Sequence, residues 1–384
     1  MLAAAPRKSP YYTESHEAFR ATLRRFVGRE IAPFVDEWDE AGTFPRELYR
    51  KAAAVGLLGI GFPEEFGGVP GDEFFSIIAA QELARAGSGG ISASLMSHTI
   101  GTPPIARLGS EELKRRVVPQ VLSGEKISAL AITEPDGGSD VANIRTKAER
   151  LGDQFVVNGA KMFITSGMRA DFYTVAVRTG GAGRAGISLL LIERGTPGLS
   201  QTPLKKMGWW ASDTAALHFE DCRVPLENLI GEENAGFSAI MFNFNRERLG
   251  MAAAANSFSQ VCYEEALGWA RERKLFGGRL IDQQVIRHKL VDMAMRINAT
   301  QAYLEALAWR VEAGDNPIAE IAMLKNQATQ TMAFCASEAV QIHGGMGFMR
   351  GTKVERIYRE VKVNAIGGGA EEIMKELAAR QLGL

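Results

Sequence analysis

Cysteine is scarce in this sequence: three cysteines occur among 384 residues, and their spacing shows no pairs. We therefore expect neither a disulfide framework nor a cysteine-based metal finger. An excess of one charge sign is also missing, because 44 Lys and Arg residues face 45 Asp and Glu residues. The net charge of −1 argues against a nucleic-acid-binding protein, which normally carries a basic surplus.

Long apolar segments are absent as well. The chain has no run of about 18 apolar residues that could span a membrane. Its N-terminus, MLAAAPRKSPYYTESHEAF, lacks the apolar stretch of a signal peptide. A cytoplasmic protein of the bacterial type is the expectation. A mitochondrial matrix protein whose transit peptide has been removed would look the same.

Several common catalytic motifs are missing too. The sequence has neither a G-x-x-x-x-G-K-[ST] phosphate loop nor a G-x-S-x-G nucleophile elbow. The glycines of HGGMGF do not lie between a strand and a helix of a βαβ unit, so a nicotinamide site of that kind is not indicated. The five histidines show no metal-ligand spacing, and we interpret His98 and His343 as structural residues. We expect no metal site.

The sequence that is present falls into three blocks. Residues 1–122 space their apolar residues at three and four positions, which indicates helices, and Ser110 is the expected N-cap of EELKRRVVPQVL. Residues 123–232 contain short β-branched and aromatic runs between glycine-rich turns, which indicates a mainly antiparallel β domain. Residues 233–384 return to long helical periods that are typical of an antiparallel bundle. The fold class predicted from these blocks is α+β.

One acidic residue lies within an apolar row of the third block. The row steps by four, three, four, three and four positions and so occupies one helix face: Ile240, Phe244, Glu247, Met251, Ala254 and Phe258. A carboxylate among apolar side chains is poorly hydrated, so its pKa should rise toward neutrality, as a general base for a carbon acid requires. A buried ion pair is the alternative interpretation, for Glu247 as for Glu265 further along the helix.

Four segments, in this order, resemble motifs of the acyl-CoA dehydrogenase family. They are ALAITEPDGGSDVANIRTKAER, VVNGAKMFITSG, RERKLFGGRLIDQQ and QIHGGMGFM. The ending, GGGAEEIMKEL, is similar to the isovaleryl-CoA and long-chain branches of the family. The resemblance covers nearly the whole chain. It implies an N-terminal helical domain, a middle antiparallel β domain and a C-terminal four-helix bundle, with FAD as the cofactor that carries the redox chemistry.

The resemblance also implies which residues bind FAD. Residues that line the flavin ring or approach its N5 region are Leu130, Ile132, Thr133, Phe163 and Thr165, with Phe163 where the family often has Trp. The turn near the pyrophosphate and the pantetheine contains Gly138 and Ser139, and Ser139 also faces the substrate. The part of the site that a neighbouring subunit builds contains Arg273, Phe276, Gln284, Gln341 and Gly345. The remaining cofactor residues are Ala370, which stands near the adenine side where a Thr is common, and Glu372.

The catalytic assignment comes from the same resemblance. In the isovaleryl-CoA and long-chain branches the base precedes an arginine in segments similar to ERL, and here that residue is Glu247. The backbone N–H of Gly368 would stabilise charge on the thioester carbonyl, with Gly367 beside it in the substrate site. Asn245 and Arg248 match positions near the pantetheine and the CoA adenine. Arg248 is interpreted nearly equally well as a structural ion-pair partner.

The function that the resemblance implies is α,β-dehydrogenation of an acyl-CoA thioester with a long or branched acyl chain. The chain is expected to assemble as a homotetramer, built as a dimer of dimers. The expected electron acceptor is an electron-transferring flavoprotein. One alternative is an oxidase or monooxygenase of the same fold that uses oxygen. Another is a CoA-thioester-binding protein without catalysis, because fold alone does not establish function. The pair Trp209 and Trp210 is expected either to cover the flavin or to fill an interface.

Overall fold

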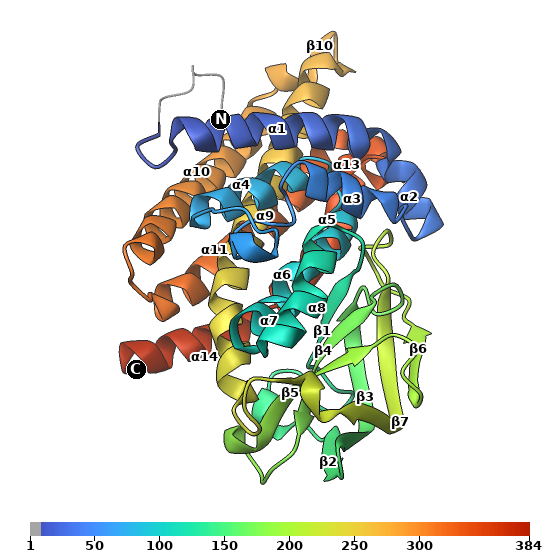
Figure 1. Ribbon diagram of the computed structural model, residues 1–384. Coiled ribbons are helices and arrows are strands. Elements are labelled where there is room, and N and C mark those ends of the chain that lie inside the picture. Colours follow the sequence, from blue (N-terminus) through green and yellow to red (C-terminus); the bar gives the residue numbers. More distant parts are fainter. Residues whose placement is uncertain (1–8) are drawn as a thin grey trace.

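The computed structural model describes residues 9–384, apart from the side chains of Phe242, Asn243 and Asn245 (Figure 1). Helices from both ends of the chain lie together, and the sheet lies at one end of them. The predicted order of a helical part, a β part and a helical bundle is confirmed. Within the described range, no helix has the length and apolar character needed to cross a membrane.

The N-terminal part of the described chain is built from helices. Their bounds are α1 Glu14–Glu30, α2 Val35–Ala41, α3 Glu47–Ala54, α4 Glu73–Ala84, α5 Gly89–Leu95, α6 His98–Gly101, α7 Pro103–Leu108 and α8 Glu111–Leu122. Side chains that accept backbone N–H groups start several of them. Asp72 accepts the N–H of Phe74 at the start of α4. Ser110 accepts the N–H of Leu113 at the start of α8, which confirms the predicted N-cap.

The middle part forms one sheet. Its strands are β1 Ser128–Ala131, β2 Lys147–Leu151, β3 Gln154–Thr165, β4 Phe172–Arg178, β5 Ile187–Glu193, β6 Leu199–Pro203, β7 Thr214–Pro225 and β8 Leu229–Ile230. The strand order is β6-β7-β3-β2-β4-β5-β8, with β1 paired to β4. The pairs β1–β4 and β2–β4 are parallel and the other pairs of this sheet are antiparallel, as the mainly antiparallel prediction requires.

The C-terminal part is a bundle of long helices. Its elements are α9 Gly236–Glu272, α10 Gln284–Glu312, α11 Ile318–His343, α12 Gly345–Phe348, α13 Lys353–Ile366 and α14 Glu371–Leu382, with a small hairpin of β9 Lys274–Leu275 and β10 Gly278–Arg279. The 37-residue helix α9 contains no proline to interrupt it. It packs against α10, α11 and α13 of the bundle and against α4 of the N-terminal part.

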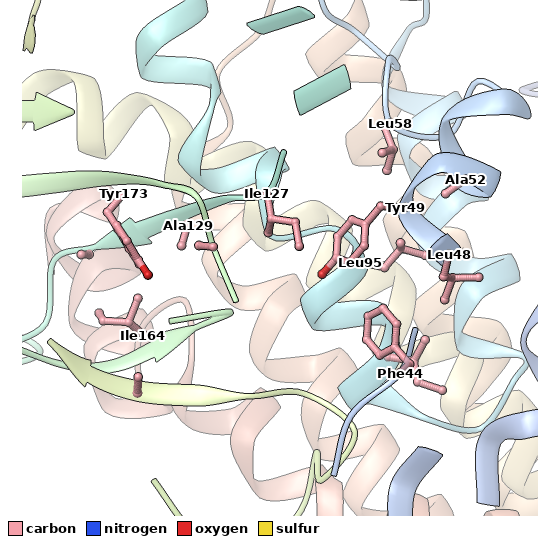
Figure 2. Close-up of a cluster of buried hydrophobic side chains, with 14 of the residues drawn as sticks. Phe44, Leu48, Tyr49, Ala52, Leu58, Leu95, Ile127, Ala129, Ile164 and Tyr173 are labelled. Carbon is pink, nitrogen blue, oxygen red and sulfur yellow. The ribbon is translucent and has the colours of Figure 1, made fainter. Parts of the chain in front are cut away.

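The hydrophobic core continues from the N-terminal helices into the sheet. Figure 2 shows Phe44, Tyr49 and Leu95 of the helical part in one buried cluster with Ile127, which directly precedes β1, and Tyr173 of β4. A second cluster fills the bundle between α9, α10 and α11. A third lies between the sheet, α7, α8 and the first turns of α9. Helix α9 therefore passes from the core of the sheet into the core of the bundle.

Candidate active site

Glu247 lies on α9 between these two cores. Ile240 and Phe244, which precede it in the row, pack against the cluster beside the sheet, and Phe258 is buried in the bundle. The predicted apolar face is thus confirmed, and Glu247 interrupts it. Some of the residue stays accessible, yet loss of hydration dominates its electrostatics. This burial raises the pKa of Glu247 to about 7, while the nearby positive charges of Arg248 and Lys325 oppose the rise.

The glycine loop between α13 and α14 meets the same face of α9. Gly368 and Gly369 have φ angles of +65° and +112°, which only glycine adopts without strain. A Cβ atom on Gly368 would lie 2.6 Å from Sδ of Met251, the next residue in the row after Glu247. The structure therefore brings the loop to the face that carries the predicted base.

Two cationic side chains hold the carbonyl groups of this loop. Arg248, which is 8% exposed, donates from Nε to the oxygen of Gly368 at 3.0 Å. Lys325 on α11 donates from Nζ to the oxygens of Ala365 and Gly369 at 3.1 and 2.8 Å. The N–H of Gly367 donates to the oxygen of Val363 at the end of α13.

The N–H of Gly368 is in a different situation. No acceptor for it is found within the described part of the chain. Arg248 holds the loop carbonyl, and its predicted contact with CoA stays a prediction. The side chain of Asn245 lies outside the described residues.

The predicted flavin residues of the β domain lie on two adjacent segments. Leu130 is in β1, buried Ile132 and Thr133 follow it, and the Thr133 oxygen accepts the N–H of Met162 in β3 at 2.7 Å. The segment is held by Lys161, which is fully buried. Its Nζ donates to the oxygen of Ile132 at 2.9 Å and to Glu134 at 2.8 Å.

An irregularity in β3 places Phe163 at the surface. The register of β3 against β7 shifts between Lys161 and Ile164. Phe163 sits in this bulge with φ +62°, an unfavourable angle for a residue with a side chain, and its ring is 67% exposed. Strained backbone and an exposed aromatic ring are both typical of ligand-binding positions. Predicted Thr165 follows at the end of the strand, paired with Thr214.

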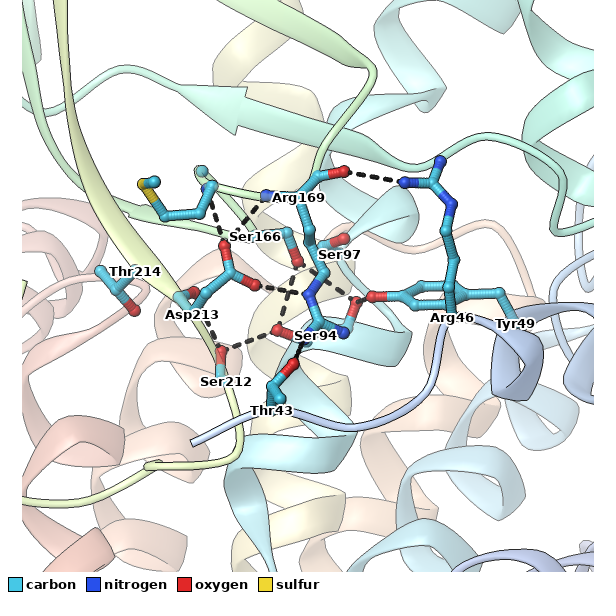
Figure 3. Close-up of polar contacts among 12 residues, drawn as sticks. Thr43, Arg46, Tyr49, Ser94, Ser97, Ser166, Arg169, Ser212, Asp213 and Thr214 are labelled. Carbon is cyan, nitrogen blue, oxygen red and sulfur yellow. Dashed lines mark hydrogen bonds and ion pairs between the residues drawn. The ribbon is translucent and has the colours of Figure 1, made fainter. Parts of the chain in front are cut away.

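A polar network fixes the end of β3 against helix α5. Figure 3 shows Asp213 between Arg169 and a backbone N–H, and Ser94 between Ser166 and Ser212. The Arg169–Asp213 ion pair spans 2.7 Å, and the Ser94–Ser212 hydrogen bond spans 2.8 Å. Because the network begins directly after Thr165, it anchors the strand that carries the predicted flavin contacts.

The turn after Thr133 folds back on it. Glu134 accepts the N–H groups of Arg145 and Thr146, at 2.6 and 2.9 Å, and so closes the loop between them. A Cβ atom on predicted Gly138 would lie 3.4 Å from Cγ2 of Thr133. Predicted Ser139 is exposed next to it.

The third predicted cofactor group lies at the far end of the bundle. Arg273 follows α9 and Phe276 is 92% exposed in the β9–β10 hairpin, while Gln284 starts α10. The ring of His343 stacks on Trp269, near the end of α9, with the ring centres 5.2 Å apart. Gln341 and Gly345 flank His343 in the sequence, so they lie at the same end of the bundle. Arg273 is 26 positions beyond Glu247, or about 39 Å along a helix. One chain therefore does not bring this group to the base (Figure 1).

The remaining predicted residues have simpler positions. Ala370 is the N-cap residue of α14, and Glu372 is exposed in its first turn. Buried His98 and His343 bond the carbonyl oxygens of Leu58 and Ala339, so both have the structural role we predicted. In residues 9–384 no cluster of three or more His, Cys, Asp or Glu side chains could hold a metal ion.

The tryptophan pair and Glu265 have identifiable partners. Trp210 lies between the guanidinium groups of Arg350 and Arg359, which are 4.2 and 3.8 Å from its ring centre. Trp209 donates its backbone N–H to Glu360 of α13, so the pair lies where the β6–β7 loop meets α13. Glu265 is ion-paired with Lys353 at 2.9 Å, and both side chains are partly exposed, so the predicted ion pair is present but is not buried.

The site also contains a residue that the sequence analysis missed. Lys325 has no exposed surface although it carries an ammonium group. Its neighbours Ile321, Ala328 and Met332 are buried at helical spacing on α11. The criterion that singled out Glu247, a charge within an apolar row, would have found Lys325 as well.

Comparison with known proteins gives three family matches in chain order. The N-terminal, middle and C-terminal domains of acyl-CoA dehydrogenase match residues 13–125, 129–222 and 234–383. The long-chain specific mitochondrial acyl-CoA dehydrogenase of Rattus norvegicus is 38% identical over 375 residues, covering 97% of this chain and 87% of the relative.

Solved structures agree with these matches. A probable acyl-CoA dehydrogenase from Mycobacterium abscessus is 48% identical, with a TM-score of 0.95 over 97% of this chain and 100% of that one. A glutaryl-CoA dehydrogenase from Mycobacterium smegmatis in complex with FADH2 is 26% identical, with a TM-score of 0.90 over 97% of this chain and 95% of that one. The resemblance of the motifs is confirmed: the chain belongs to the acyl-CoA dehydrogenase family of oxidoreductases.

Proposed function

We propose that this enzyme dehydrogenates the α,β-bond of long or branched acyl-CoA thioesters with Glu247 as the base. The observation that carries the proposal is the position of Glu247, whose pKa burial raises to about 7, on the α9 face that meets the Gly368 loop. A base with a pKa near neutrality can be ionised at physiological pH and still accept a proton from carbon. Glu265, on the same helix, has a lysine partner and no such loop beside it.

The chain's own groups divide the work on the substrate. Glu247 accepts the α-proton on its carboxylate, and the N–H of Gly368 donates a hydrogen bond to the thioester carbonyl as negative charge develops there. One preorganised donor of this kind is typically worth roughly 2.7–4 kcal/mol. Arg248 and Lys325 hold the loop carbonyls and so keep this N–H in place.

FAD fits the residues of the β domain. The exposed ring of Phe163 offers a stacking surface, and the Ile132–Thr133 segment beside it is held by buried Lys161. When bound, FAD supplies the two-electron acceptor for the hydride that leaves the β-carbon. The M. smegmatis relative named above contains the reduced cofactor, which supports the assignment.

The acyl chain and the electron acceptor are supported by relationship. The rat relative is long-chain specific by name. The resemblance of the segment Glu247-Arg248-Leu249 to the long-chain and isovaleryl-CoA branches supports the same choice of substrate. We propose a homotetramer that passes electrons to an electron-transferring flavoprotein. Oxygen uptake during turnover, in the absence of that flavoprotein, would favour the oxidase alternative instead.

The decisive test is anaerobic mixing of the FAD-loaded enzyme with straight and branched acyl-CoAs while the oxidised-flavin absorbance is followed. Wild type is expected to bleach with long or branched members. Glu247→Gln should bind them without bleaching, whereas Glu265→Gln, the matched carboxylate on α9, should bleach normally. Bleaching of Glu247→Gln at the wild-type rate would refute the base assignment. No bleaching of wild type with any thioester would favour a binding protein.

A further inference from the structure

Lys325 is a buried charge with a specific set of partners. Its side chain has no exposed surface, and its amine donates to the carbonyl oxygens of Ala365 and Gly369. Removing an ammonium group from water is costly unless hydrogen bonds and opposite charges compensate. The Ala365 oxygen belongs to the last turn of α13, where a cation also interacts favourably with the helix dipole. Lys325 therefore caps the C-terminal end of α13.

The two carbonyls that Lys325 binds lie on either side of Gly368. One precedes the glycine loop and the other ends it, so a single amine fixes both ends of the segment. The next residue of α11, Asn326, donates to the oxygen of Glu371 at 2.9 Å and holds the start of α14. Arg248 reaches the Gly368 oxygen from α9. The backbone around Gly368 is thus held from two helices.

The charge of Lys325 also acts on Glu247. The groups that face Lys325 are Glu247 and Arg248 on α9 and Glu371 and Glu372 on α14. Burial lowers the pKa of Lys325 to about 8, so the amine is largely protonated at pH 7. Its positive charge, with that of Arg248, favours the ionised form of Glu247 against burial.

We infer that Lys325 is a positioning residue for the dehydrogenation: its ammonium group fixes the glycine loop so that the Gly368 N–H faces the thioester carbonyl, and its charge favours the ionised form of Glu247. This inference rests on the proposed function. It assigns to one buried lysine two effects that can be separated, one on geometry and one on charge.

The charge effect is tested in the FAD-loaded enzyme without substrate. Infrared difference spectroscopy follows the protonated carboxyl band of Glu247, identified by its loss in Glu247→Gln, as a function of pH. Lys325→Met, similar in length and uncharged, is expected to raise the pH of half-titration by about one unit. Lys289→Met is the control, because Lys289 pairs with Glu338 elsewhere on the bundle and should leave the titration unchanged.

Both effects appear in the rate of flavin reduction by an acyl-CoA. If the pKa of Glu247 rises by about one unit, its ionised fraction at pH 7 falls from about one half to about one tenth. The flavin of Lys325→Met should therefore be reduced about fivefold more slowly from this cause alone. Any slowing at about pH 7 beyond the fall in the ionised fraction of Glu247, measured by infrared spectroscopy at the same pH, reports the displaced loop, because Lys325 of the wild type is still protonated there. Lys325→Arg keeps the charge and should keep the titration while showing this further slowing at about pH 7.

The possible results separate this inference from the proposed function. An unchanged Glu247 titration in Lys325→Met overturns the charge effect, even where wild type is reduced normally by acyl-CoA. If the rate of Lys325→Met at about pH 7 falls only in proportion to the ionised fraction of Glu247, the geometric effect is overturned. If Lys325→Met does not fold, a wild-type rate for Lys325→Arg at about pH 7 overturns the geometric effect. A shifted titration together with a wild type that no acyl-CoA reduces supports the charge effect and refutes the proposed function.

Discussion

At the scale of single residues, the site contains groups whose local energies are unfavourable. Glu247 and Lys325 are charged side chains placed where burial disfavours their charge. Phe163 combines an exposed ring with φ +62°. Such features persist only where the surrounding structure enforces them, and they concentrate at functional positions.

Phe163 allows a prediction that compares the stability of the apoprotein with its affinity for FAD. Phe163→Gly removes backbone strain of about 1–2 kcal/mol but adds flexibility that costs about 0.5–1 kcal/mol. The free energy of unfolding of the apoprotein should therefore change by less than about 1 kcal/mol. FAD affinity should fall about two- to tenfold, because a ring contact worth about 0.5–1.5 kcal/mol is lost.

Chemical denaturation and flavin titration measure the two effects. Phe163→Tyr is the control, since it keeps both the ring and the strain and should bind FAD like wild type. A large loss of apoprotein stability with unchanged FAD affinity would mean that the ring is a packing residue.

The sequence predicted some of these residues for clear reasons. Glu247 was predictable because a helical period of apolar residues marks a face, and the acidic residue on it was visible. The strain at Phe163 was not predictable from the residues themselves, because it arises from a register shift between β3 and β7 and not from a glycine. The carbonyl contacts of Lys325 depend on a loop 40 residues further along the chain.

At the scale of elements, the α13–α14 connection is the most constrained turn of the site. Two consecutive glycines adopt positive φ, and the loop lies against Met251 of α9. Gly368 therefore faces two separate restrictions, one from its backbone and one from space.

A matched pair of glycines separates these restrictions. Gly383, at the end of α14, has φ +72° with nothing within 4 Å of an added Cβ, whereas Gly368, at φ +65°, would place that atom 2.6 Å from the Met251 sulfur. Gly383→Ala should cost only the backbone term, about 1–2 kcal/mol. Gly368→Ala should cost more and should slow flavin reduction as the loop moves.

Thermal unfolding measures the loss of stability, and stopped-flow spectroscopy measures the rate of flavin reduction. Adding Met251→Ala to Gly368→Ala should recover part of the rate by making room. If the two single glycine variants lose equal stability and Gly368→Ala keeps the wild-type rate, the contact with α9 has no role in placing the loop.

The elements themselves were largely predictable. The long helical periods of residues 233–384 were predictable from their apolar spacing, and the structure has the first of these helices, α9, from Gly236 to Glu272. The parallel pairing of β1 with β4 was not predicted, because strand partners depend on contacts between distant segments.

At the scale of the whole molecule, one buried carboxyl joins the three parts of the chain. Glu360 of α13 is 1% exposed and accepts the N–H of Gly89 in α5 at 2.8 Å and of Trp209 in the β6–β7 loop at 3.2 Å. Burial, with a smaller contribution from the negative charge of Asp39, raises the pKa of Glu360 to about 7, while the N–H of Gly89 and the charges of Arg356 and Arg359 oppose the rise.

This raised pKa predicts how stability changes with pH. The folded state holds the Glu360 proton more tightly than the unfolded state, whose pKa is near 4.5. Its contribution is therefore fully present below about pH 4.5 and is lost as the pH rises through about 7, a change of roughly 3 kcal/mol.

Glu360→Gln tests the effect. At about pH 5 the variant should be less stable by about 1–3 kcal/mol, because its amide nitrogen faces a backbone N–H. By about pH 8 the difference should shrink or reverse. Urea unfolding at both pH values measures the difference in stability. The control is Glu376→Gln, because Glu376 is exposed and pairs with Arg380 on α14. A difference that does not depend on pH would show that Glu360 is ionised in the folded protein throughout.

The separation of the cofactor residues leads to the last prediction. Arg273 is about 39 Å along α9 from Glu247, so we expect it to complete the site of a neighbouring subunit. Arg273→Ala should weaken FAD binding about tenfold or more, as the loss of a charged donor does, and Glu247→Gln should retain FAD without reduction.

In a dimer with one copy of each variant, the two defects fall on one site and the other site is intact. Purified mixed dimers carrying two different tags should therefore recover about half of the wild-type flavin reduction at limiting FAD, while either variant alone stays inactive. If Arg273 serves its own chain, both sites of the mixed dimer are defective and no activity returns.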